Sequence, residues 1–210
     1  MGAAHLVAAG IMSAERARVS VLLYPGCIVF EIAAVLELLA RSCELRCFTP
    51  DAQPHAASNG TRLLADGSYA DAVVYEARCV IVPGGNPDAI IEPGSANACL
   101  IAAHRRGALL AGICAGSLVI ARAGLLKGRR ATHNYTLEHT SADVVACTAP
   151  IFDGIVFERA DVVVDAPFIT AQHWAHVPFA AAVAQQLGVM SPAEAAQYLQ
   201  RQRFSYGAPA

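Results

Sequence analysis

The chain has 210 residues, of which 55% are hydrophobic and 15% are charged, and its formal net charge is −2. This length allows one well-formed hydrophobic core and favours a single domain. The pI near 6.4 argues against a nucleic-acid binder, which typically has a high pI or basic clusters. No apolar run reaches the roughly 18 residues of a membrane span, so we expect neither nucleic acid nor a membrane as a partner.

Residues 1–17 are predicted to form a disordered N-terminal extension. The stretch MGAAHLVAAGIMSAERAR is rich in alanine and lacks the basic n-region of a signal peptide. A regular pattern begins only near Arg18, which makes Met12 a candidate for the true start and leaves open whether residues 1–11 belong to the native protein. We expect one domain over residues 18–210.

Strand and helix signals alternate through the first part of the domain. The expected strands are apolar runs at 19–24, 44–50, 78–85 and 108–113. Helical spacing occurs at 30–41 and 95–107 and again directly after 113. Near-continuous apolar strands separated by helices predict a parallel sheet that is covered on both faces.

The pattern changes in the last third of the chain. The segments 143–150 and 154–172 are predicted to be shorter strands, the second with a turn at 159–161. Helices are predicted at 177–188 and 191–202, the latter with Ser191 as its N-cap and Pro192 at its first position. No repeat or linker divides the chain.

The seven cysteines do not predict disulfides. They are Cys27, Cys43, Cys47, Cys79, Cys99, Cys114 and Cys147. The odd count, the irregular spacing and the lack of a CxxC pair argue against a disulfide framework and against a zinc site. We expect a reducing cytoplasmic compartment, with most of these side chains buried as small hydrophobes.

Cys114 differs from the other cysteines in its setting. The sequence GICAG, residues 112–116, joins a predicted buried strand to a predicted helix and has the G-x-nucleophile-x-G form of a strand-to-helix elbow. Small neighbours suit the strained turn, and the amides and dipole at a helix N-terminus favour a thiolate. The alternative is an ordinary buried cysteine, but the flanking glycines, strand and helix favour a nucleophile.

A longer block around this elbow resembles a known family. The segment VPGGNPDAIIEPGSANACLIAAHRRGALLAGICAGSLVIARAGLLKGRRATHNY is similar to the central block of the ThiJ/PfpI superfamily, also called class-I glutamine-amidotransferase-like proteins. The resemblance runs from about Val19 to Gly188. It implies a flavodoxin-like three-layer α/β sandwich with a mainly parallel central sheet and a nucleophile elbow. It also implies a homodimer that acts without a cofactor.

The resemblance assigns catalytic roles to three residues. The family's acidic residue falls on Glu31, its nucleophile on Cys114 and its histidine on His133. In the family the carboxylic acid hydrogen-bonds the cysteine sulfur, which implies the same contact here. Glu31 could instead be a solvated residue in the first turn of a helix, but its apolar neighbours favour a buried carboxyl that needs a partner. His133 could merely cap a loop.

Further positions are candidates for substrate binding. The resemblance implies an oxyanion site made by the backbone amides of Gly84, Gly85 and Ala115, although the two glycines could be plain turn residues. Candidates for lining the pocket, chosen by their position in the chain, are Tyr135, Gln172, His173 and Trp174. His173 and His176 have a spacing that one helical face could offer to a metal, but no carboxylate or cysteine is nearby in the sequence, and we expect no metal site.

A thiolate beside a neutral carboxylic acid can attack a small electrophilic carbon. We therefore expect a small electrophile as substrate, and the expected function is glyoxalase- or deglycase-like, with an α-ketoaldehyde converted to a hydroxy acid. Isonitrile hydratase is the alternative, but those relatives have Asp where this chain has Glu31 and Thr where it has Ala115. A redox sensor or chaperone with an oxidisable Cys114 is an alternative of another class. The expected resting state of the pair is a Cys114 thiolate beside a protonated Glu31.

Overall fold

The structure, a computed structural model, describes residues 16–203. Seven strands form one sheet in the order β10-β11-β7-β6-β1-β2-β5. Two further pairs, β3-β4 and β8-β9, stand apart from it. The fold class expected from the sequence is confirmed: it is a mixed α/β fold with a mostly parallel central sheet.

The strands are β1 (Ala17–Leu22), β2 (Cys43–Thr49), β3 (His55–Ala56), β4 (Arg62–Leu63), β5 (Gly67–Ser68), β6 (Cys79–Val82), β7 (Leu109–Ile113), β8 (Arg130–Ala131), β9 (Val156–Phe157), β10 (Val162–Asp165) and β11 (Phe168–Ala171). The helices are α1 (Phe30–Leu39), α2 (Tyr69–Tyr75), α3 (Asp88–Ile91), α4 (Asn97–Arg105), α5 (Ala115–Arg122), α6 (Ala142–Thr148), α7 (His176–Gln186) and α8 (Pro192–Arg203).

The middle strands of the sheet run parallel to one another. β1 pairs in parallel with both β2 and β6, and β7 pairs in parallel with β6 and β11. Only β10 is antiparallel, on β11. The carboxyl ends of β1, β6 and β7 therefore meet at one edge, which is where ligands bind in open α/β sheets.

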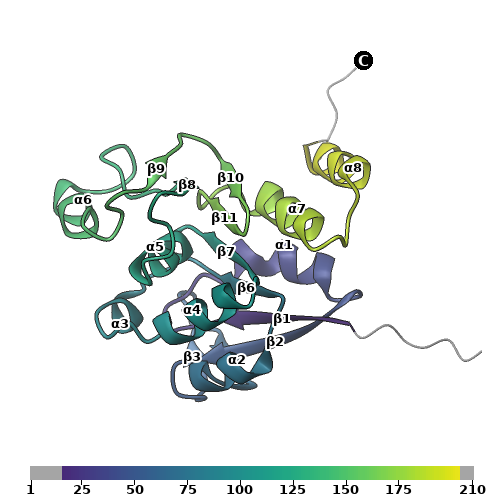
Figure 1. Cartoon of the computed structure of the whole chain (residues 1–210), viewed down its shortest axis with the longest axis horizontal. Helices are drawn as coiled ribbons and strands as arrows, with labels where there is room; N and C mark the ends of the chain where they lie inside the picture. The colour runs from purple at the N-terminus through teal and green to yellow at the C-terminus, as the bar shows by residue number, and fades with distance from the viewer. Residues whose placement is uncertain (1–15, 204–210) are drawn as a thin grey trace, which may run out of the picture.

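Helices cover both faces of the sheet, as Figure 1 shows. α1 and α7 pack against each other on one face, while α2 and α4 lie together on the other. The strands between them are buried almost throughout: all four residues of β6 and all five of β7 are buried. Burial on both faces explains why these strands are near-continuous apolar runs in the sequence.

Two helices, α2 and α6, illustrate where the structure differs from the expectation. The predicted strand at 143–150 is wrong, since this stretch forms α6, whose N-cap Ser141 accepts a hydrogen bond from the amide of Val144 at 3.4 Å. α2 was not expected, although Ser68 and Asp71 form a capping box at its start. In both cases a short polar cap begins a helix in a segment with weak helical periodicity.

The N-terminal boundary is earlier than predicted. Ala17 already belongs to β1, so the expected extension over residues 1–17 is too long by at least Arg16 and Ala17. The candidate start at Met12 and residues 1–11 lie outside the described residues. In the part of the chain that the structure describes, no helix is long and apolar enough to span a membrane. Most cysteines are buried as expected, but Cys147 is exposed on α6.

Candidate active site

Cys114 lies at a strained turn between β7 and α5. Its backbone has φ 55° and ψ −123°, a left-handed φ that residues other than glycine rarely adopt. The amide of Cys114 donates a hydrogen bond of 2.9 Å to the carbonyl of Ala171 at the end of β11. Strain of this kind persists only where the surrounding structure holds it, and it concentrates at functional sites.

The glycines on either side of Cys114 are required by close packing. A Cβ at Gly112 would lie 2.6 Å from the carbonyl carbon of Gly116. A Cβ at Gly116 would lie only 2.1 Å from the carbonyl oxygen of Val82, the last residue of β6. These contacts give the physical reason for the GICAG pattern: a side chain at either glycine would push α5 away from the sheet.

Gly84 lies against both the carboxyl of Glu31 and the sulfur of Cys114. A Cβ at Gly84 would be 2.3 Å from Glu31 Oε2 and 2.7 Å from Cys114 Sγ. The amide of Gly84 donates a 2.9 Å hydrogen bond to Oε2 of Glu31, so this amide has a different partner from the oxyanion expected from the sequence. Glu31, in the first turn of α1, is 1% exposed, and it is therefore not a solvated helix residue.

Burial controls the protonation of this pair. It raises the pKa of Glu31 to about 7, against hydrogen bonds from Gly84 and Cys114 that lower it. Burial and the negative charge of Glu31 raise the pKa of Cys114 to about 11, while hydrogen bonds from the backbone amides of Ala115 and Gly85 to the sulfur lower it. The shift for Cys114 is opposite to the expected thiolate, because loss of hydration outweighs the helix amides.

Asn134 is a site residue that the sequence analysis missed. Its Nδ2 lies 3.8 Å from Cys114 Sγ and donates to the sulfur. No local pattern marks this residue, and the only hint is that it directly follows His133. Its Oδ1 is buried and has no hydrogen-bond partner among residues 16–203.

His133 is close to the site but is held by aromatic rings. Its ring stacks on Phe152 with centroids 3.9 Å apart, and Phe157 lies at 4.7 Å. Its Nδ1 accepts a 3.1 Å hydrogen bond from the amide of Tyr135, so the proton of the neutral ring is on Nε2. Burial lowers the pKa of His133 to about 4. Within the described residues, no hydrogen bond joins His133 to Cys114.

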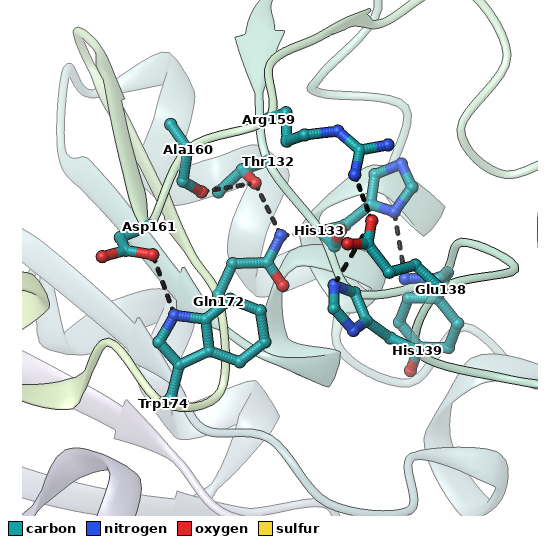
Figure 2. Close-up of polar contacts among 10 residues, drawn as sticks. Thr132, His133, Glu138, His139, Arg159, Ala160, Asp161, Gln172 and Trp174 are labelled. Carbon is teal, nitrogen blue, oxygen red and sulfur yellow. Dashed lines mark hydrogen bonds and ion pairs between the residues drawn. The ribbon is translucent and has the colours of Figure 1, made fainter.

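Gln172 holds the backbone of the segment that carries His133 by hydrogen bonds (Figure 2). The amide Nε2 of Gln172 donates to Thr132 Oγ1 at 2.8 Å and to the carbonyl of His133 at 3.0 Å. Thr132 in turn donates from its hydroxyl to the carbonyl of Ala160. Its amide donates to Thr170 Oγ1. Gln172 therefore positions the segment that carries His133 and Asn134.

The remaining candidates differ in their surroundings. Burial, followed by the charges of Cys114, Asp88 and Glu31, raises the pKa of the Tyr135 hydroxyl. Trp174 is half-exposed and donates a 2.8 Å hydrogen bond to Asp161 (Figure 2). Its ring also contacts the ring of His173. His176 faces the ring of Phe30 instead. Among the described residues, no group of three or more His, Cys, Asp or Glu side chains could hold a metal ion.

Comparisons with known proteins show the family and the fold. The model of the DJ-1/PfpI family matches residues 17–186. A Streptomyces lividans protein, named an uncharacterized protein in the cpoL 5′ region, is 28% identical over 142 residues, which are 65% of this chain and 99% of that protein. Drosophila melanogaster DJ-1beta has a TM-score of 0.73 at 20% identity, covering 91% of this chain and 100% of that one. A DJ-1 superfamily protein of Agrobacterium tumefaciens has a TM-score of 0.71 at 25% identity, covering 89% and 98%.

Proposed function

The chain belongs to the DJ-1/PfpI family, and from this premise we propose that it is an enzyme in which Cys114 attacks a small electrophilic carbon and Glu31 carries the proton. Family membership supports a cysteine-based activity. The observation that carries the proposal is the convergence of Glu31 Oε2 and Cys114 Sγ on the one glycine, Gly84, that leaves room for both. A buried carboxyl in contact with a buried thiol is costly for stability, which favours a functional reason for the pair.

The electrostatics of the pair suit proton transfer. A general acid–base group works best with a pKa near the working pH, and burial brings Glu31 to about 7. With the pKa of Cys114 near 11, the two groups share one proton across the neutral and mildly basic range. Glu31 can therefore accept the thiol proton as the sulfur attacks and return it in the next step.

The reaction that fits best is the conversion of an α-ketoaldehyde to a 2-hydroxy acid. The sulfur forms a bond to the aldehyde carbon, and the thiol proton passes through Glu31 to the aldehyde oxygen. Glu31 then takes the hydrogen of that carbon as a proton and delivers it to the neighbouring ketone carbon, while the proton of the new hydroxyl on the first carbon moves to the ketone oxygen. The products of this step are a thioester at the first carbon and a hydroxyl at the second. Water cleaves the thioester, releasing the hydroxy acid and restoring the Cys114 thiol.

The same residues bear on the alternatives. An isonitrile hydratase also needs a thiol and an acid, so its substrate is a necessary comparison in any assay. A redox sensor needs an accessible thiol with a low pKa, whereas Cys114 is 9% exposed and its pKa is raised. That observation favours an enzyme, in which Glu31 removes the proton only when substrate is present.

The test is turnover of methylglyoxal and of a simple isonitrile by the wild-type protein. We expect lactate from methylglyoxal and no formamide from the isonitrile. Cys114→Ser and Glu31→Gln should each abolish turnover, while Cys147→Ser, which removes an exposed cysteine on α6, should leave it unchanged. Turnover that survives Cys114→Ser, or formamide as the only product, would contradict the proposal.

We also propose that the active form is a homodimer. The support is the apolar composition of the chain and the exposure of Phe30, which is 60% exposed at the start of α1, directly beside Glu31. Light scattering of wild type and Phe30→Ser at micromolar concentration tests this. A wild-type monomer would contradict it, and a dimer that Phe30→Ser leaves intact would remove Phe30 from the interface.

A further inference from the structure

Three groups approach the sulfur of Cys114 as hydrogen-bond donors. Two are the backbone amides of Ala115 and Gly85, which the elbow and the turn after β6 hold in place. The third is the side chain of Asn134, whose Nδ2 is 3.8 Å from the sulfur. It is the only one of the three that a substitution can remove without changing the backbone of the elbow.

The segment that carries Asn134 is fixed on both sides. Upstream, Gln172 binds Thr132 and the carbonyl of His133. Downstream, the amide of Tyr135 donates to His133 Nδ1, and the His133 ring is stacked on Phe152. A side chain on so constrained a backbone loses little entropy when it binds the sulfur, which strengthens its effect.

The orientation of the Asn134 amide leaves one of its atoms without a partner. Oδ1 is buried and accepts no hydrogen bond from residues 16–203, whereas Nδ2 is directed at the sulfur. Leaving a buried carbonyl oxygen unpaired costs free energy. Asn134 keeps this unfavourable arrangement while its Nδ2 donor faces Cys114 Sγ, which indicates a role in the chemistry rather than in packing.

We propose that Asn134 is a catalytic residue that stabilises negative charge on the Cys114 sulfur. The inference rests on the proposed function for its purpose, since a thiolate is the attacking species. Burial works against that thiolate, and Glu31, when ionised, repels it. The Asn134 amide adds a neutral donor that opposes both effects without introducing a second charge.

The test uses two substitutions of Asn134, and the proposed role and a purely structural role predict opposite orders for their alkylation rates. Asn134→Ala removes the donor, and Asn134→Asp keeps the shape but places a carboxylate beside the sulfur. In a Cys147→Ser background, we expect Cys114 to be alkylated by iodoacetamide at pH 8 about fivefold more slowly in Asn134→Ala, and more slowly still in Asn134→Asp. A structural role predicts the reverse order, because Asp preserves the packing and Ala does not.

Asn97→Ala, which replaces an asparagine at the start of α4, is the matched control and should keep the wild-type rate of alkylation. Circular dichroism of each variant shows whether it is folded, and the Asp variant keeps the test usable if the Ala variant unfolds. Wild-type alkylation in both Asn134 variants, or slower alkylation in Ala than in Asp, would overturn the proposal. The measurement needs no substrate, so a protein that fails to turn over methylglyoxal contradicts the proposed function and leaves this result standing.

Discussion

Replacing Glu31 by glutamine should lower the pKa of Cys114. Glu31 Oε2 and Cys114 Sγ lie 2.3 and 2.7 Å from the same point, the position of a Cβ at Gly84, so their separation is at most the sum of these distances. At roughly 5 Å and an effective dielectric constant of about 20, a carboxylate opposes a thiolate by about 3 kcal/mol, or roughly two pKa units. Glutamine removes this charge but keeps the size of the side chain.

The assay is a pH titration of thiolate absorbance at about 240 nm. Subtracting the spectrum of the matching Cys114→Ser protein removes the contribution of tyrosines and of the other cysteines. In wild type the Cys114 thiol should titrate near 11, and in Glu31→Gln it should titrate roughly two units lower. Alkylation by iodoacetamide, mapped to the Cys114 peptide, should become faster at pH 8 by roughly a hundredfold, because two pKa units change the thiolate fraction by about this factor.

Two results would refute this reasoning. An unchanged titration in Glu31→Gln would mean that the carboxylate does not act on the sulfur. A higher pKa in the variant would mean that Glu31 stabilises the thiolate, as an acid that donates its proton to the sulfur would do. In that case the shared proton resides on the carboxyl, and the sequence-based expectation of a thiolate beside a neutral acid would be restored.

Three further outcomes are expected. Gly84→Ala should abolish turnover and lower the free energy of unfolding by several kcal/mol, measured by urea denaturation, because its Cβ would overlap Glu31 and Cys114; a stable, active variant would contradict the geometry. Raising the pH from 4.5 to 8 should lower the free energy of unfolding of wild type by about 3 kcal/mol relative to Glu31→Gln. The reason is that the pKa of Glu31 is raised to about 7 in the folded protein, so its contribution to stability is fully present below pH 4.5 and is lost as pH rises through 7. The pH dependence of His133 has the opposite sign, because burial lowers its pKa to about 4. Its contribution to stability is present above pH 6.5 and is lost as pH falls toward 4, so the free energy of unfolding of His133→Phe should fall less in acid than that of wild type. An equal fall in both proteins would count against burial as the cause.

The parts that sequence reasoning could predict are those with local signals. The strands β1, β6 and β7 are apolar runs because both faces of the sheet are covered, and the elbow is marked by glycines that close packing requires. The strand prediction for α6 is wrong because Val144 and Val145 favour a strand, whereas the hydrogen bond accepted by the N-cap Ser141 stabilises the start of a helix.

The protonation state of the site and the role of Asn134 could not be predicted in this way. The pKa of Cys114 depends on how much water the folded chain removes from the sulfur, which is a property of the whole core. Asn134 is 20 positions after Cys114 in the chain, in a segment with no regular periodicity, and its side chain reaches the sulfur only in the folded protein. Both facts exist only after distant segments have packed together.

The elbow also has a consequence for the newly made protein. Its parts come from three strands: Gly116 packs on Val82, and the amide of Cys114 is paired with the carbonyl of Ala171. During synthesis the ribosome releases Val82 and Cys114 before Ala171, so an incomplete chain lacks the carbonyl that accepts the hydrogen bond of the Cys114 amide. Until Ala171 emerges, we expect the Cys114 thiol to be less protected by the fold and more open to oxidants and to pairing with the cysteines before it. The nascent chain, rather than the finished protein, is therefore the stage at which this cysteine is most exposed to damage.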